Sequence, residues 1–191
     1  MKTKLIIIVL ALFFQKSNAQ NSDTNIQGGI TSFISWITNL DDQVNNIYKT
    51  QNKNKLIRQL GYIGSDLDYL ALEKAKLAET VIEQFNSGES EISINLLDEY
   101  KESIDNLNRN ITKLIVLLND QYQVEGNEIL DKIRHDLNNR KDVELKEIAR
   151  MLSEENEFNE VRIRESAERA RLNAISARDA VFELRKKLLS E

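Results

Sequence analysis

The chain has 191 residues, with 26 basic and 31 acidic side chains, a formal net charge of −5 and a pI near 5.2. This acidic balance argues against nucleic-acid binding, because that affinity rests on lysine and arginine contacts with phosphates. The sequence has no cysteine, which excludes disulfides and thiolate chemistry, and it has no proline and six glycines, which favours long helices.

Residues 1–19 predict a secretory signal peptide. A lysine-containing start precedes an unbroken apolar run over residues 5–14, and small residues end at Ala19, where a signal peptidase would cut. The run is shorter than the roughly twenty residues that cross a bilayer, so we expect no stable membrane span after signal removal. The exported protein, in the periplasm or outside a bacterial cell, would keep 23 basic and 31 acidic residues, a net charge of −8. The alternative, an uncleaved amphipathic first helix, is disfavoured because the run is apolar all round.

Residues 20–29 predict a flexible N-terminal segment, because they are polar and include two glycines. From residue 30 to residue 137, apolar residues recur alternately three and four positions apart, which predicts an elongated all-α bundle of four to five long helices in the whole chain. The first series of apolar residues is Ile30, Phe33, Ile37, Leu40, Val44 and Ile47.

A second series follows the polar stretch over residues 49–55. Its members are Leu56, Leu60, Ile63, Leu67, Leu70, Leu77 and Val81. Lys74 occupies one position of this series, where we expect a snorkelling surface lysine. The glycines at 61 and 64, with Ser65 and Asp68 as a capping box, predict a kink or short break near residues 61–65. Asn86-Ser87-Gly88 predicts a helix end.

A third series predicts the next helix and the most buried one. Its members are Leu97, Tyr100, Ile104, Leu107, Ile111, Leu114 and Leu118. Gly126 predicts a weak turn over residues 125–127. After this turn Ile129, Ile133 and Leu137 continue a helical face to the end of the predicted bundle.

The pattern over residues 138–191 predicts a long C-terminal helix of the kind found in coiled coils. Its apolar residues form what we call the C-terminal seam: Ile163, Ala167, Ala170, Ala174, Ala177, Val181, Leu184 and Leu188. The seam is only two positions wide, which suits contact with one or two partner helices. Two interpretations stay open: a protruding coil that associates with another chain, or a last helix that closes its own bundle.

Four arginines spaced seven residues apart flank this seam and form what we call the arginine column: Arg164, Arg171, Arg178 and Arg185. Their forked guanidinium groups would recognise an acidic partner helix and fix its register. The alternative, which we favour because charge runs are usually solvated helix faces, is pairing within the chain, for example with Asp66 and Glu73.

The sequence indicates no catalytic, cofactor or metal site. His135 is the only histidine, and with Asp131 four residues earlier it offers two ligands at most, fewer than a catalytic metal site needs. Carboxylate-bridged di-iron bundles have a similar architecture but require two Glu-x-x-His motifs. We therefore predict that the protein is not an enzyme.

These features predict an exported, non-catalytic interaction or scaffold protein, which binds a protein partner or a second copy of itself through its helices. In size, signal and helix content the chain resembles the small exported subunits of conjugative (type IV) secretion machines, which implies a place in an envelope or secretion assembly. One alternative is a bundle that binds a small molecule between its helices, with Gly61, Gly64 and Lys74 leaving a gap with one charge. The other is a membrane-acting helical protein, which the acidic charge disfavours.

Overall fold

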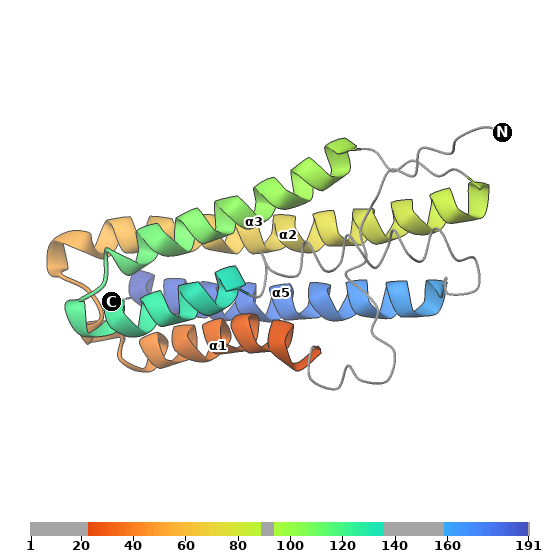
Figure 1. The fold of residues 1–191 in the computed structure, drawn as a ribbon. Helices are drawn as coiled ribbons and strands as arrows, with labels where there is room; N and C mark the ends of the chain where they lie inside the picture. Colours follow the sequence, from red (N-terminus) through yellow and green to blue (C-terminus); the bar gives the residue numbers. More distant parts are fainter. Residues whose placement is uncertain (1–22, 89–93, 136–158, 191) are drawn as a thin grey trace.

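The computed structural model describes residues 23–88, 94–135 and 159–190, which form an all-α helical bundle (Figure 1). This confirms the predicted fold class. Its labelled helices are α1 (Asp23–Asp42), α2 (Lys53–Ser87), α3 (Ile94–Ile115) and α5 (Glu160–Ser190). A further helix covers residues 120–135, and two short 3₁₀ helices, η2 (Val44–Asn46) and η3 (Thr50–Asn52), connect α1 to α2. The predicted signal peptide lies outside the described residues.

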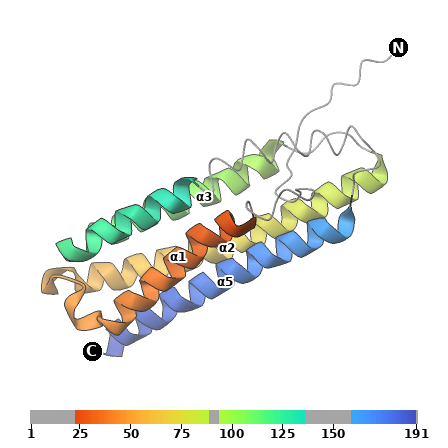
Figure 2. The ribbon, with the colours of Figure 1, turned by 60° about the horizontal axis from the view of Figure 1, so that its bottom comes forward.

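The long axis of the bundle is the pair of α2 and α5, which lie side by side and run in opposite directions (Figures 1 and 2). α3 packs against α2, and α1 packs against α5. α1 and α5 run in the same direction, since Lys187 near the end of α5 donates to the backbone carbonyl of Asp41 near the end of α1 (2.6 Å). None of the helices in the described ranges is long and apolar enough to cross a membrane.

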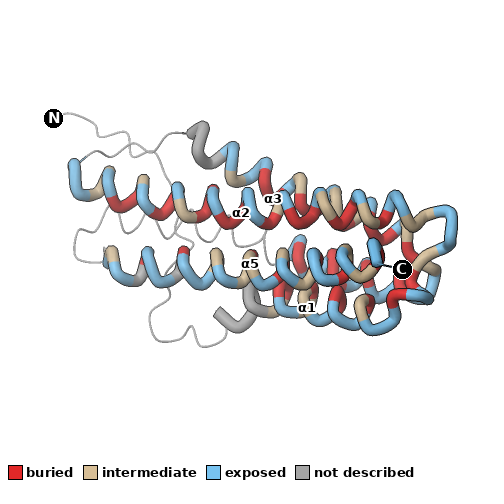
Figure 3. The backbone as a smooth tube through the Cα atoms, turned by 180° about the vertical axis from the view of Figure 1, so that it is seen from behind, coloured by how far each residue is buried: buried red, intermediate tan, exposed pale blue. Residues whose placement is uncertain are grey.

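The hydrophobic core is built largely from described members of the first three predicted series, and the buried parts of the helices face one another (Figure 3). The largest fully buried side chains are Trp36, Phe33, Ile37, Leu40, Ile47, Leu56, Leu60, Ile63, Leu67, Leu77, Leu107 and Ile111. Burial of one such aliphatic or aromatic side chain stabilises a fold by about 1.5–3 kcal/mol. The spacing of three and four residues therefore reports the core correctly.

The predicted helix end after Asn86-Ser87 is confirmed. α2 ends at Ser87, and Gly88 adopts the left-handed conformation with a φ of 72°. Its backbone N–H donates to the carbonyls of Gln84 and Phe85, which would otherwise lack a partner at the helix end.

The predicted break near residues 61–65 is wrong. α2 continues through this stretch, and the hydroxyl of Ser65 donates back to the carbonyl of Gly61 (3.1 Å) instead of capping a new helix. The reason lies in packing: Gly64 leaves space for the ring of Phe182 on α5, and Gly61 lies beneath the guanidinium of Arg185. Both glycines serve the contact between two helices.

The predicted turn at residues 125–127 is also wrong, because the 120–135 helix runs through it. A Cβ on Gly126 would lie 2.8 Å from Cζ2 of Trp36 and 2.9 Å from Cγ1 of Ile115, so this glycine permits close helix packing. The chain instead turns between Ile115 and residue 120. There the backbone N–H of Asn119 donates to the carbonyl of Ile47 (2.8 Å) and ties this turn to the α1–α2 connection.

Two further boundaries differ from the sequence analysis. α1 begins at Asp23, so residues 23–29 are helical where a flexible segment was expected. Asn159 is non-helical and α5 begins at Glu160, so the helix predicted over residues 138–191 is not continuous. The part of that prediction over residues 138–158 lies outside the described residues.

Candidate functional site

The C-terminal seam faces the protein's own helices. Seven of its side chains are buried and Ala170 is half-buried, and α5 packs against α2 and α1 along this seam. The small alanines let the helix axes approach closely, as the intramolecular interpretation requires. In this arrangement the seam is occupied inside the chain and offers no free surface for another helix.

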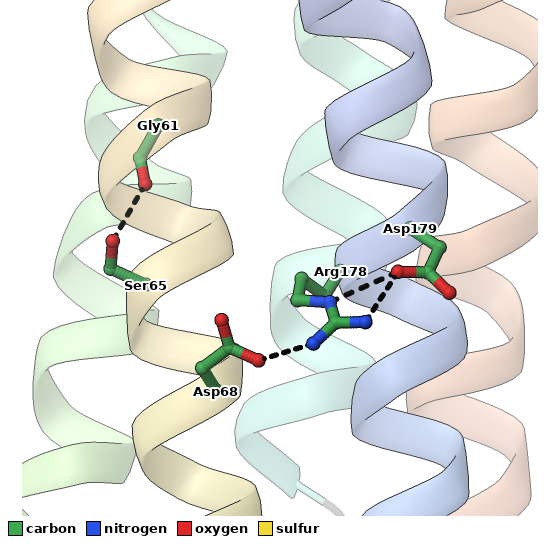
Figure 4. Close-up of polar contacts among 5 residues, drawn as sticks. All are labelled: Gly61, Ser65, Asp68, Arg178 and Asp179. Carbon is green, nitrogen blue, oxygen red and sulfur yellow. Dashed lines mark hydrogen bonds and ion pairs between the residues drawn. The ribbon is translucent and has the colours of Figure 1, made fainter.

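The arginine column pairs with carboxylates and a carbonyl of the same chain. Arg178 donates to Asp68 of α2 (2.7 Å) and to its neighbour Asp179 (2.7 Å), as Figure 4 shows. At the two ends of the column, Arg164 contacts Glu79 and Arg185 donates to the carbonyl of Ile57 (3.2 Å), both on α2.

The remaining member, Arg171, pairs within α5, donating two hydrogen bonds to Glu168 (2.7 and 2.6 Å). These hydrogen bonds lower the pKa of the Glu168 carboxyl and raise that of the Arg171 guanidinium. Each arginine of the column is therefore satisfied by a group of its own chain.

The carboxylates that the sequence analysis named for this pairing have other partners. Asp66 accepts a hydrogen bond from the side-chain amide of Asn110 on α3 (2.7 Å), and that amide group also accepts one from Gln59 (3.0 Å). Burial raises the pKa of Asp66, while the Asn110 hydrogen bond and nearby positive charges partly oppose the rise. Glu73 is buried and accepts from Lys76 (2.6 Å). The arginine column uses Asp68 and Glu79 instead.

The gap expected for a small ligand in the second series is filled. Side chains of α5 occupy the space above the two glycines of α2. Lys74, expected at the surface, is buried, and its ammonium group lies 5.5 Å from the ring centroid of Tyr100. A cation over an aromatic face is a stabilising contact, so this lysine serves the α2–α3 interface.

The single histidine lies on an exposed face of the 120–135 helix. His135 and Asp131 are both exposed, and Asp131 pairs with Arg134 (3.9 Å). Within the described ranges, no group of three or more histidine, aspartate or glutamate side chains is placed to hold a metal ion.

A surface that the sequence analysis did not single out lies on the outward face of α2. Tyr62, Tyr69 and Leu72 are 52 %, 42 % and 51 % exposed, and we call them the α2 stripe. Spacings of seven and three residues place them on one side of the helix. The sequence contained the information needed to find this surface, because these three large residues share one side of a helix and belong to none of the apolar series.

No family model, curated protein or solved structure matches this chain.

Proposed function

We propose that this protein is an exported, non-catalytic interaction protein that binds a helix of another protein on the α2 stripe. The observation that carries the proposal is the exposure of two tyrosines and a leucine on one outward side of the longest described helix. Isolated exposed apolar residues are ordinary, whereas large residues aligned on one side of a helix are the usual anchors of an interface.

The side chains of the α2 stripe favour a protein partner that presents both apolar and polar groups. Tyrosine offers a large apolar ring at a low entropic cost, together with a hydroxyl that accepts or donates a hydrogen bond. Ser65 lies between the two tyrosines in sequence and is exposed on the same side, so the surface is amphipathic. An amphipathic partner helix would place its apolar residues between the rings and its polar residues at the edges.

Occupation of the C-terminal seam supports this location. A scaffold that bound its partner through the seam would have to release α5 from α2 and α1, exposing buried leucines and alanines. Binding on the α2 stripe leaves the bundle intact. We therefore place the partner site on α2.

Photo-crosslinking in the cells that naturally express the protein tests the proposal. A photoreactive amino acid at position 69 or 72 is expected to capture one discrete protein. The same group at position 124, an exposed valine on the 120–135 helix, is the matched control and is expected to capture none. In the same experiment, Tyr62→Glu would abolish capture from position 69. Capture from position 124 alone, or from no position, would overturn the proposed site.

Export is tested separately by N-terminal sequencing of the protein isolated from cell fractions. We expect a chain that begins at Gln20 and is found outside the cytoplasm. A cytoplasmic chain that retains residues 1–19 would contradict export. It would not contradict the partner site on the α2 stripe, which the crosslinking experiment tests.

A further inference from the structure

A groove of about 440 Å³ lies between α3 and the 120–135 helix, and no residue of the α2 stripe lines it. Its size falls in the range of small-molecule sites, about 300–1,000 Å³. The residues that line it are Asp105, Asn108, Arg109, Thr112, Lys113 and Arg134. Three cations and one carboxylate thus meet on a protein whose overall charge is negative.

The cations of the groove form few close ion pairs, although the charges of Arg109 and Lys113 are near enough to Asp66 of α2 to act against the rise of its pKa. Arg109 and Lys113 lie one turn apart on α3, both are exposed, and neither forms an ion pair with another residue in the described part of the chain. Arg134 reaches across from the other helix and donates to the hydroxyl of Thr112 (3.3 Å). Among the described residues, Arg134 pairs with Asp131 at the long distance of 3.9 Å.

The wall of the groove also holds a buried amide with spare hydrogen-bonding capacity. The side chain of Asn108 belongs to a residue that is 7 % exposed, and its Oδ1 has no hydrogen-bond partner among the described residues. Its backbone carbonyl accepts from Thr112 (2.8 Å), so the two residues are held together. Because the two ends of an amide exchange by rotation, this group is able to donate to a ligand or accept from one.

We infer that this groove binds a phosphate group carried by a small molecule or a lipid. A phosphate offers three oxygens and close to two negative charges, which matches three cations arriving from two helices better than a single carboxylate does. The arginines would bind in their forked geometry and Lys113 as a point charge. Asp105 is the carboxylate among the lining residues, and it would repel a bound phosphate and so favour placing the phosphate oxygens against the cations.

Calorimetric titration of the purified protein with inorganic phosphate, at ionic strength held constant with sodium chloride, tests this inference. We expect saturable binding at one site per chain. The variant Arg109→Gln/Lys113→Gln/Arg134→Gln is expected to bind at least about tenfold more weakly, since it loses the charge-assisted hydrogen bonds. The matched control Lys55→Gln/Arg58→Gln/Lys186→Gln removes the same charge from other exposed positions and is expected to bind like the wild type.

Two further measurements keep the outcome clear. Lys113 donates no hydrogen bond to another residue in the described part of the chain, so the single variant Lys113→Gln is expected to stay folded. Circular dichroism would establish that it is folded, and titration is expected to show weaker phosphate binding. Co-sedimentation with vesicles containing phosphatidic acid, a lipid phosphate monoester, distinguishes the sources. Vesicle binding that the triple variant loses indicates a lipid headgroup, and phosphate binding alone indicates a soluble ligand. No saturable phosphate binding, or equal loss in the matched control, would overturn the inference. Neither result bears on the α2 stripe.

Discussion

The ring of Phe182 on α5 occupies the space where a side chain at Gly64 of α2 would begin. A Cβ at position 64 would lie 2.7 Å from Cζ of this ring. Along α2, Gly61, Gly64 and Asp68 are three and four residues apart, and their contacts on α5, Arg185, Phe182 and Arg178, follow the same steps in reverse. Glycine 64 thus helps to set the antiparallel register of the two longest helices.

Gly64→Ala is the substitution that measures this relationship. Alanine favours a helix over glycine by about 0.8–1 kcal/mol, but here its methyl group would push the Phe182 ring toward solvent. In a Phe182→Ala background, we expect Gly64→Ala to raise the free energy of unfolding by about 1 kcal/mol. With Phe182 present, the same substitution is expected to give a smaller gain or to destabilise the protein. Urea unfolding of the four proteins, followed by circular dichroism, gives the coupling energy.

Gly61→Ala is the matched control for that cycle. A Cβ at position 61 would lie 3.5 Å from Nε of Arg185, an ordinary contact distance. Its effect is expected to be a gain of up to about 1 kcal/mol whether or not Phe182 is present. Equal effects of Gly64→Ala in both backgrounds would show that the ring does not depend on this glycine.

Gly126→Ala is expected to destabilise the protein by about 1–3 kcal/mol, because both neighbours of the new methyl group are buried side chains with little room to move. Trp36 is the single tryptophan of the chain, so its fluorescence reports the disturbance directly. A shifted emission maximum together with a lower urea midpoint is the expected result. An unchanged emission spectrum with higher stability would mean that the helix at residue 126 packs less closely than described.

The glycines show what the sequence could and could not predict. The inward faces of α1, α2 and α3 follow from the spacing of apolar residues, which is a local property of each helix. Gly61, Gly64 and Gly126 were interpreted as interruptions because glycine weakens an isolated helix. Their role depends on which helix lies opposite. For Gly61, Gly64 and Gly126 this is decided by Arg185, Phe182 and Trp36, which lie far away in the sequence.

The partners of the arginine column illustrate the same limit. The seven-residue spacing placed the four arginines on one face, and pairing within the chain was the favoured interpretation. Choosing Asp68 and Glu79 over Asp66 and Glu73 required the register of α5 on α2, which no local pattern carries. The groove on α3 was missed for a related reason, because Arg134 joins the other two cations only after the chain has turned at residues 116–119.

Arg178→Gln is expected to lower stability modestly. Its pairing with Asp68 is partly exposed, and such pairs contribute about 0.2–1 kcal/mol. A double-mutant cycle of Arg178→Gln with Asp68→Asn is expected to give a coupling in this range at low salt that shrinks at 1 M sodium chloride, because salt screens exposed charges. The cycle of Arg171→Gln with Asp68→Asn is the control and is expected to give none. A coupling that does not respond to salt would argue against an exposed ion pair.

Ala177→Glu tests whether the C-terminal seam closes its own bundle. Ala177 is fully buried, so a glutamate there would place an unpaired charge in the core and cost about 3 kcal/mol or more. Ala170→Glu, at a half-buried position, is expected to cost clearly less. Light scattering of the wild type is expected to give the mass of a single chain. A wild-type dimer that Ala177→Glu separates without loss of helicity would instead assign the seam to an intermolecular contact.

Asp66→Asn is expected to leave the protein as stable as the wild type at pH 7, or more stable. Burial raises the pKa of Asp66 above its ordinary value of 3.8, so the folded protein binds this proton more tightly than the unfolded chain does. The ionised group therefore reduces stability as the pH rises from 3.8 through the folded pKa, and the reduction is complete above it. Asparagine keeps an oxygen to accept from Asn110 (2.7 Å in the wild type) and has no charge to bury. Urea unfolding at several pH values measures the difference in stability between the variant and the wild type, which should become smaller as the pH falls toward 3.8. The control Asp98→Asn, at an exposed position of α3, should not raise the stability at pH 7. A variant less stable than the wild type at pH 7 would mean that the attraction of Asp66 to Arg109 and Lys113 outweighs its burial.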